Sequence, residues 1–440
     1  MSDPSNFQRF SNWLKESLFV KLGSIAFLVL ILMLPNVMVR DLINERQSRQ
    51  NEAVAAVSQS WGGPQTITGP VLSIPYTSWI DQGNGQRKAV QEIANFLPEQ
   101  LDISGNVQHQ VRQKGIYDVI LYQADLQLKG NFQKPDLSEL HINPADVQWE
   151  QARISLGISG RTGIRSSIAM DWASQSLRME PGTASPKLLS SGVSKQVEID
   201  PAADSFSFSI PLKVNGSSQL EFEPVGKETT VSLRSDWASP NFQGSFLPEN
   251  REISPDGFNA RWEVFDFNRN YPQSWKNDTY QLGESTFGVQ LIQPVDEYLK
   301  NERSAKYAIL VIGLTFMIYF FFEILRKFYI HPFQYFLVGL ALSVFYLLLL
   351  SLSEQLGFDL AYLIASLATV GLIAGYSNSF LKSPRLSIQL TLLLAAIYAF
   401  IFVVLQLEDY ALLAGSVGLF AALAAVMYYS RKVDWYTIGE

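Results

Sequence analysis

The 440-residue chain has no cysteine and only three histidines, His109, His141 and His331. Without cysteine there can be no disulfide, thiol catalysis, Cys-ligated zinc or iron–sulfur cluster. The histidines are not in the paired spacing of a zinc motif, and there is no Walker loop, dinucleotide-binding glycine motif or GxSxG nucleophile elbow. These absences predict a protein that is not an enzyme and holds no metal or cofactor.

Charge is scarce as well. Only 17% of the residues are charged, and the formal net charge is −7. Nucleic-acid binding depends largely on clustered lysine and arginine that neutralise phosphates. A weakly acidic chain therefore does not indicate a nucleic acid as partner.

Long apolar runs are what the chain has instead. Each of the C-terminal runs is roughly 17–20 residues long, which is the length of α-helix that crosses about 30 Å of hydrocarbon. The five runs are Tyr307–Leu325, Phe333–Leu352, Leu360–Tyr376, Leu386–Leu405 and Tyr410–Tyr429. A sixth run, Leu22–Val39, lacks the small-residue cleavage site of a signal peptide and is predicted to be an uncleaved anchor. The lipid bilayer is therefore the first predicted partner.

The charges between the runs predict which way the chain crosses. Alternate gaps contain basic residues, at Arg326 and Lys327, Lys382 and Arg385, and Arg431 and Lys432. The other two gaps contain only acids, Glu354 with Asp359 and Glu408 with Asp409. Because short basic loops stay in the cytoplasm, residues 1–21 and 430–440 are predicted to be cytoplasmic. Residues 40–306 then lie outside, residues 22–39 form the first transmembrane helix, and residues 307–429 form a five-helix transmembrane block.

The outer segment is predicted to be rich in β-strands. Asp41–Ala56 has no Gly or Pro and is expected to continue the first membrane helix. Val71–Tyr76 is expected to be a strand, and a short helix is expected after Pro294. Polar and apolar residues alternate in Ser205–Ile210, Gln219–Glu223, Thr230–Arg234 and Arg261–Val264, which is typical of half-buried antiparallel strands.

The predicted fold is therefore an α+β membrane protein with six transmembrane α-helices, one N-terminal and five C-terminal. A large β-rich, sandwich-like domain follows the first helix. The pattern leaves open whether this domain is one body or two, divided near Pro181–Ser194.

A longer motif joins the helical and β-rich parts. The run INERQSRQNEAVAAVSQSWGGPQTITGPVLSIPY, from Ile43 to Tyr76, resembles the signature of the CreD family of bacterial inner-membrane proteins. Its turn-forming residues are Trp61, Gly62, Gly63, Pro64, Gly69, Pro70 and Pro75. The resemblance implies a role in cell-envelope integrity in a Gram-negative inner membrane. It implies no catalytic residue.

Few polar residues interrupt the membrane runs. Glu323 is the only acidic residue in them, and it lies three and four residues before Arg326 and Lys327. This spacing favours a local ion pair over a proton relay. Small residues at Gly371 and Gly375, and at Gly418 and Ala422, are candidates for close helix packing.

Two functions of different classes remain. The first is a non-enzymatic envelope protein whose periplasmic β-domain binds or braces an envelope component or a membrane-protein partner. The second is a membrane transporter or lipid-handling protein with the β-domain as a receiver. The near absence of charge within the runs favours the first. The sequence does not give the oligomeric state.

Overall fold

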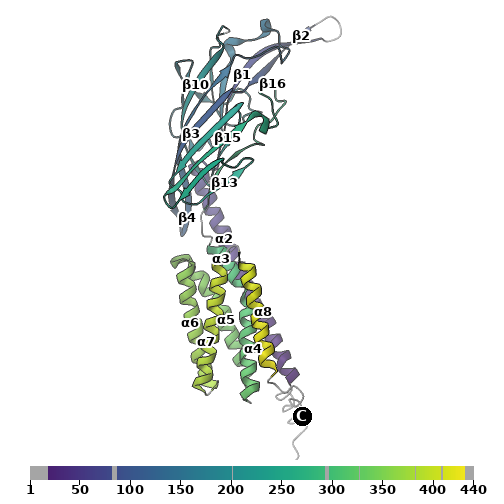
Figure 1. Cartoon of the computed structure of the whole chain (residues 1–440), viewed down its shortest axis with the longest axis vertical. Coiled ribbons are helices and arrows are strands. Elements are labelled where there is room, and N and C mark those ends of the chain that lie inside the picture. Colours follow the sequence, from purple (N-terminus) through teal and green to yellow (C-terminus); the bar gives the residue numbers. More distant parts are fainter. Residues whose placement is uncertain are drawn as a thin grey trace, which may run out of the picture. The chain divides into compact units, whose positions relative to one another are not determined.

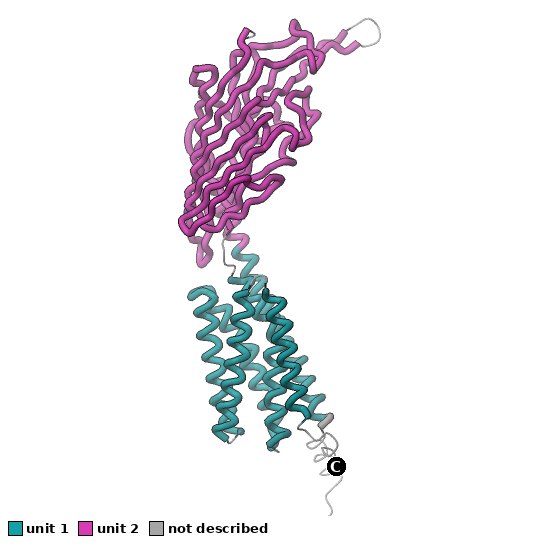
Figure 2. The backbone as a smooth tube through the Cα atoms, viewed as in Figure 1, with its two compact units in different colours: residues 1–50, 295–440 teal, residues 51–294 magenta. Residues whose placement is uncertain are grey.

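The structure, a computed structural model, describes residues 18–81, 87–200, 202–292, 297–326, 328–381, 383–407 and 410–431. The chain forms two compact units, residues 1–50 with 295–440, and residues 51–294 (Figure 2). The division at residue 50 falls inside one helix, α2 (Leu18–Trp61), which begins in the first unit and ends in the second.

The first unit, called here the membrane unit, consists of α-helices. After α2 these are α3 (Glu297–Lys306), α4 (Ala308–Arg326), α5 (Pro332–Leu356), α6 (Phe358–Leu381), α7 (Pro384–Gln406) and α8 (Ala411–Ser430). Within the described residues, six helical stretches are long and apolar enough to cross a membrane, one near the N-terminus and five toward the C-terminus. The predicted number and order of spans are confirmed (Figure 1). The short helix expected after Pro294 is α3.

Helix α2 has 44 residues, about 66 Å at 1.5 Å per residue. The predicted anchor Leu22–Val39 and the helix predicted at Asp41–Ala56 are both parts of it, and Pro35 lies within it without ending it. Leu32 of α2 is 1% exposed and packs against α5 at Gly339. A Cβ on Gly339 would lie 2.1 Å from Leu32 Cδ1, so this glycine allows α2 to approach α5 closely.

The second unit, called here the β-unit, contains two sheets (Figure 1). The nine-stranded sheet, called sheet A, follows the order β13-β17-β11-β1-β5-β9-β8, with β2 paired to β1 and β16 paired to β2. Its strands are β1 (Gln65–Asp81), β2 (Arg87–Phe96), β5 (Arg153–Ile158), β8 (Glu180–Pro181), β9 (Gly192–Gln196), β11 (Gln219–Glu223), β13 (Pro240–Gly244), β16 (Ser274–Lys276) and β17 (Phe287–Leu291).

The eight-stranded sheet, called sheet B, follows the order β14-β15-β12-β3-β4-β10-β6-β7. Its strands are β3 (Gln100–Lys114), β4 (Tyr117–Gln133), β6 (Ala169–Trp172), β7 (Gln175–Arg178), β10 (Ser205–Ser217), β12 (Glu228–Ser235), β14 (Asn250–Ser254) and β15 (Gly257–Phe265). The four alternating segments noted in the sequence lie in β10, β11, β12 and β15, as predicted.

Sheets A and B share one hydrophobic core. Trp262 of sheet B is fully buried, and its ring centre is 5.9 Å from that of Phe287 and 5.6 Å from that of Phe242, both in sheet A. Residues on both sides of Pro181–Ser194 belong to the same cluster. The β-unit is therefore one sandwich-like body, which answers the question that the sequence left open.

Two details differ from the prediction. The strands were expected to be antiparallel, but β1 pairs with β11 and β3 with β12 in parallel. Long connections between these partners allow the parallel pairing. Gly69 and Pro70 were expected to border a turn, but they lie inside β1, where the pairing with β5 shifts register between Thr68 and Val71. The turn therefore ends before the second Gly-Pro pair.

Some predictions concern residues outside the described ranges. Residues 1–17 of the N-terminal segment and 432–440 of the tail are among them. So are Lys327, Lys382 and Lys432 of the basic gaps, and Glu408 and Asp409 of one acidic gap.

Candidate functional site

The Trp-Gly-Gly-Pro motif forms a tight turn at the end of helix α2. The helix ends at Trp61, and the amides of Gly62 and Gly63 both donate to Ser58 O, at 3.0 and 2.8 Å. Gly62 has a φ of +136°, which side chains other than glycine rarely adopt. A Cβ there would lie 2.5 Å from the carbonyl oxygen of Asn215 in β10. The turn therefore requires glycine for both conformation and space.

The side chain that follows the motif holds the turn to the sheets. Gln65 is completely buried at the start of β1. Its Nε2 lies 2.9–3.0 Å from the carbonyl oxygens of Gly62, Gly160 and Asn215, and its Oε1 accepts the Gly160 amide at 3.1 Å. One side chain therefore joins segments that are 95 and 150 residues away in sequence.

Trp61 itself lies between two arginines. The guanidinium of Arg112 in β3 is 3.9 Å from the Trp61 ring centre, and that of Arg165 is 4.6 Å from it. Cation–π contacts at this range contribute roughly 0.5–2 kcal/mol each. The last turn of α2 is thereby fixed to the β-unit, so we call this cluster the α2 clamp (Trp61, Gly62, Gln65, Arg112 and Arg165).

The other signature residues are spread along the chain near the clamp. Gly63 has a φ of +69°, and a Cβ on it would meet no atom within 4 Å. Gly69 and Pro70 lie at the register shift in β1. Pro75 accepts the Gln148 amide at 2.9 Å, and Pro64 accepts the Ser159 hydroxyl at 3.0 Å. The sequence motif thus marks a structural junction.

A polar groove of about 960 Å³ crosses the outer face of sheet B. Period-two alternation points every second residue away from the core, and where the groove crosses β3, β4, β12 and β15 these residues are polar. One transverse row crosses β4, β3, β12, β15 and β14 in that order. Its residues are Asp125, Asn106, Arg234, Asn259 and Glu252.

The next transverse row explains the hollow. Across the same five strands, its residues are Gln127, Ser104, Ser232, Arg261 and Asn250. The two short serine side chains leave room between the longer side chains at either end. The groove is therefore a direct result of which residues face outward at this level of the sheet.

Charge in the groove is mixed. Arg234, Arg251 and Arg261 line it and form no ion pair with any other described residue. At one end is Asp236, whose Oδ1 is 2.8 Å from Nδ1 of His109 and 2.9 Å from the His109 amide nitrogen. Burial acts to raise the pKa of Asp236, but these hydrogen bonds outweigh it and lower the pKa below its usual value. The three guanidinium groups are thus available to an anionic group on a ligand.

A buried carboxylate, Glu223, lies elsewhere in the β-unit. It is 1% exposed and accepts the Tyr271 hydroxyl at 2.8 Å. Burial raises the pKa of Glu223, although the hydrogen bond from Tyr271 and, to a smaller extent, the nearby Arg269 partly oppose the effect. The Arg269 guanidinium is bonded to Tyr271 O and Gln273 Oε1. These contacts hold the segment between β15 and β16 in place.

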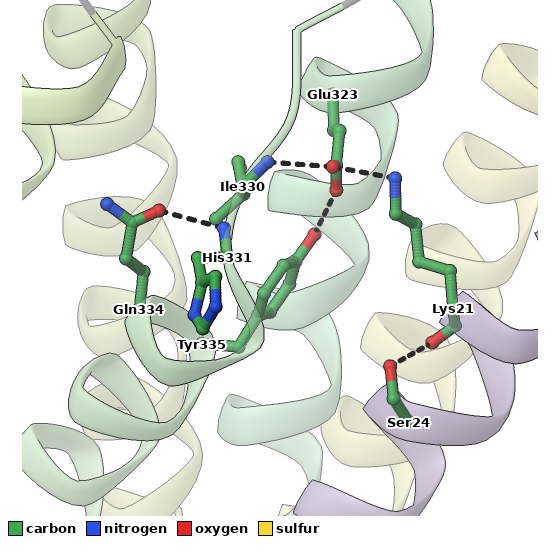
Figure 3. Close-up of polar contacts among 7 residues, drawn as sticks. All are labelled: Lys21, Ser24, Glu323, Ile330, His331, Gln334 and Tyr335. Atoms are coloured by element: carbon green, nitrogen blue, oxygen red, sulfur yellow. Dashed lines mark hydrogen bonds and ion pairs between the residues drawn. The ribbon is translucent and has the colours of Figure 1, made fainter. Parts of the chain in front are cut away.

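In the membrane unit, Glu323 of α4 is 2% exposed and accepts hydrogen bonds from three partners (Figure 3). Its Oε1 accepts Lys21 Nζ of α2 at 2.7 Å and the Ile330 amide at 2.8 Å. Its Oε2 accepts the Tyr335 hydroxyl at 3.0 Å. The predicted local pairing with Arg326 was wrong: Glu323 points into the bundle, whereas Arg326 is exposed, and Lys327 lies outside the described residues.

A second polar layer lies at the other end of the membrane unit. Glu354 of α5 accepts the Tyr298 hydroxyl at 3.0 Å and lies 3.7 Å from Arg46 of α2. Between the two layers, Asn36 donates to Ala305 O at 3.2 Å. Helix α2 is therefore held to the other helices at three levels by polar contacts.

The small-residue pairs behave differently from each other. A Cβ on Gly418 would lie 2.1 Å from the Phe400 ring, so α8 meets α7 closely there, with Ala422 one turn further on. Around Gly371 and Gly375 there is no atom within 4 Å of an added Cβ. These two glycines do not make the helix contact within the chain that the sequence pattern suggested, because they face away from α5 and α7.

The three histidines hold structural positions. His109 lies on the surface of β3, His141 is exposed with a φ of 52°, and His331 caps α5 by accepting the Phe333 amide at 3.2 Å. Among the described residues no group of three or more His, Asp or Glu side chains is placed to hold a metal ion.

Taken together, six apolar helices, two polar layers and a β-sandwich define an integral membrane protein with a large folded insertion between its first and second spans. The family described as "Inner membrane protein CreD" matches residues 17–436, and the chain belongs to this family. It is 35% identical, over 435 residues, to the Escherichia coli (strain K12) protein named "Inner membrane protein CreD", covering 97% of this chain and 95% of that protein. This chain is an inner membrane protein, as the signature predicted.

Proposed function

We propose that this protein supports the integrity of the cell envelope without catalysing a reaction, by holding a cell-wall chain in the groove on sheet B. The observation that carries the proposal is the groove itself, about 960 Å³ in volume and lined by amide, hydroxyl, guanidinium and carboxylate groups. Its volume lies within the range of roughly 300–1,000 Å³ that ligand sites occupy.

The charge pattern favours a periplasmic location for the groove. Arg326, Arg385 and Arg431 end α4, begin α7 and follow α8, and short basic loops stay in the cytoplasm. With six spans, both chain ends are then cytoplasmic, and the insertion between the first and second spans is outside. The groove then faces the compartment that contains the cell wall.

The chemistry of the groove fits peptidoglycan, whose saccharides carry hydroxyl and amide groups and whose peptides carry carboxylates. Asn106, Asn259 and the serines of β3 and β12 can donate to and accept from hydroxyl and amide groups. Arg234 and Arg261 can bind carboxylates through two parallel hydrogen bonds. The groove runs across the strands, so a linear chain would contact β4, β3, β12 and β15 in turn.

Filling the groove should weaken this binding. We expect Ser232→Trp to reduce the affinity of the full chain for soluble peptidoglycan fragments at least tenfold, because the indole would occupy the hollow above Ser104 and Ser232. Arg261→Ala should reduce it by about tenfold, as loss of a charge-assisted hydrogen bond costs roughly 1.5–3 kcal/mol. Calorimetric titration of the detergent-solubilised protein measures both effects.

Two control variants lie outside the groove. Ser207→Trp places the same side chain on β10, at an exposed position of the same sheet. Lys129→Ala removes a positive charge from an exposed position of β4. Both should bind like the unmodified chain. The proposal fails if the unmodified chain binds no fragment, or if the groove variants bind as well as the controls.

A transporter is the alternative function, and the membrane unit does not favour it. A transport pathway usually keeps an ionisable group accessible within the spans. Glu323 is instead buried and accepts hydrogen bonds from Lys21, Tyr335 and a backbone amide, as expected for a carboxylate with a structural role.

A further inference from the structure

An apolar groove of about 620 Å³ lies on the side of the membrane unit between α4, α7 and α8. We propose that it binds one anionic phospholipid of the surrounding membrane, with an acyl chain along the groove and the headgroup at Arg326. This inference does not depend on the function proposed for the β-unit.

The dimensions of the groove fit one lipid leaflet. Along α4 its lining extends from Leu314 to Arg326, about 18 Å at 1.5 Å per residue. One leaflet contributes about half of the roughly 30 Å hydrocarbon thickness. An acyl chain lying against α4 would therefore reach from mid-membrane to the end of the helix.

Polar groups occur at one end only. Arg326 is the last residue of α4, Gln389 lies in the second turn of α7, and Tyr429 is next to the end of α8. The same end has Arg385 and Arg431, and we call these residues the basic end (Arg326, Arg385 and Arg431). Arg326 forms no ion pair with any described residue, and Glu323, the nearby carboxylate, is bonded to Lys21.

Affinity must come from this basic end. Lipid tails are as apolar as the groove, so exchanging one tail for another releases little free energy. An anionic headgroup adds an ion pair with Arg326, and basic pockets between helices on the cytoplasmic side are typical sites for such headgroups. The groove therefore selects lipids by headgroup.

A second copy of the chain is a poorer occupant. Copies inserted in the same orientation would bring two basic ends to the same level of the membrane, where like charges repel.

Native mass spectrometry of the purified full chain tests the site. With phosphatidylglycerol and phosphatidylethanolamine supplied in equal amounts, we expect phosphatidylglycerol to be retained about fivefold more, the effect of one basic residue near the membrane surface. Arg326→Gln should bring the ratio close to one. Ala425→Phe should reduce retention of both lipids, because Ala425 lines the groove.

Matched controls are available in the same unit. Ala424→Phe adds the same ring to an exposed position of α8 outside the groove lining, and Arg303→Gln removes a positive charge from α3. Both should leave the ratio at about fivefold. The proposal is overturned if the unmodified chain retains the two lipids equally, if Arg326→Gln keeps the preference, or if the groove is covered in a stable dimer that excludes lipid.

Discussion

Replacing Lys21 by Met should destabilise the membrane unit by about 2–4 kcal/mol, because it leaves the buried Glu323 carboxylate without its counter-charge. Glu323 is 2% exposed and Lys21 is 21% exposed, so most of the cost comes from burying the unpaired carboxylate away from water. The double variant Lys21→Met with Glu323→Gln should recover much of the loss, because it removes both charges. Thermal unfolding of the full chain in detergent, followed by circular dichroism of the helices, measures the effect.

The second ion pair of α2 is the control for this experiment. Arg46 is 39% exposed and lies 3.7 Å from Glu354, which is 14% exposed. Because water screens this pair, Arg46→Met should cost only about 0.5 kcal/mol. Equal losses for Lys21→Met and Arg46→Met, or no recovery in the double variant, would contradict the buried-pair explanation.

The neighbouring glycines of the α2 clamp should respond very differently to alanine. At Gly62 the backbone strain of φ +136° costs about 1–3 kcal/mol. The Cβ would also lie 2.5 Å from Asn215 O and 2.8 Å from Gly163 Cα, which adds roughly 1–3 kcal/mol. Against a total stability of about 5–15 kcal/mol, Gly62→Ala should greatly reduce the amount of folded protein.

Gly63→Ala provides the comparison, since this glycine has a φ of +69° and open space around it. Its cost should be about 1 kcal/mol, the usual penalty for alanine in the left-handed region. Unfolding in urea, followed by the circular dichroism of the β-strands, gives the loss in free energy of unfolding for both variants. A loss for Gly62→Ala as small as that for Gly63→Ala would show that the clamp can relax around an added methyl group.

Much of the fold could be predicted because its signals are local. The length of each apolar run predicted a span, and period-two alternation predicted β10, β11, β12 and β15. These patterns depend only on neighbours in the sequence. The parallel pairing of β3 with β12 depends on residues more than a hundred positions apart, so alternation alone could not reveal it.

The candidate sites were harder to predict for the same reason. Lys21 and Glu323 are 302 residues apart, and the sequence suggested the nearer Arg326 as the partner. The groove depends on Ser104 and Ser232 being side by side, which requires the register of two strands. The signature motif could be located from its Gly and Pro residues, but its partners Arg112 and Arg165 could not.

The side of the membrane on which the β-unit lies is the central claim of this account. The chain has no cysteine, so single cysteines can be introduced without removing others. Asp256→Cys lies at the exposed turn between β14 and β15, and Ser379→Cys at the exposed end of α6 near the basic end. A thiol reagent that does not cross the inner membrane should label the first in intact cells and the second only after the membrane is opened. Labelling of Ser379→Cys but not Asp256→Cys in intact cells would contradict the account.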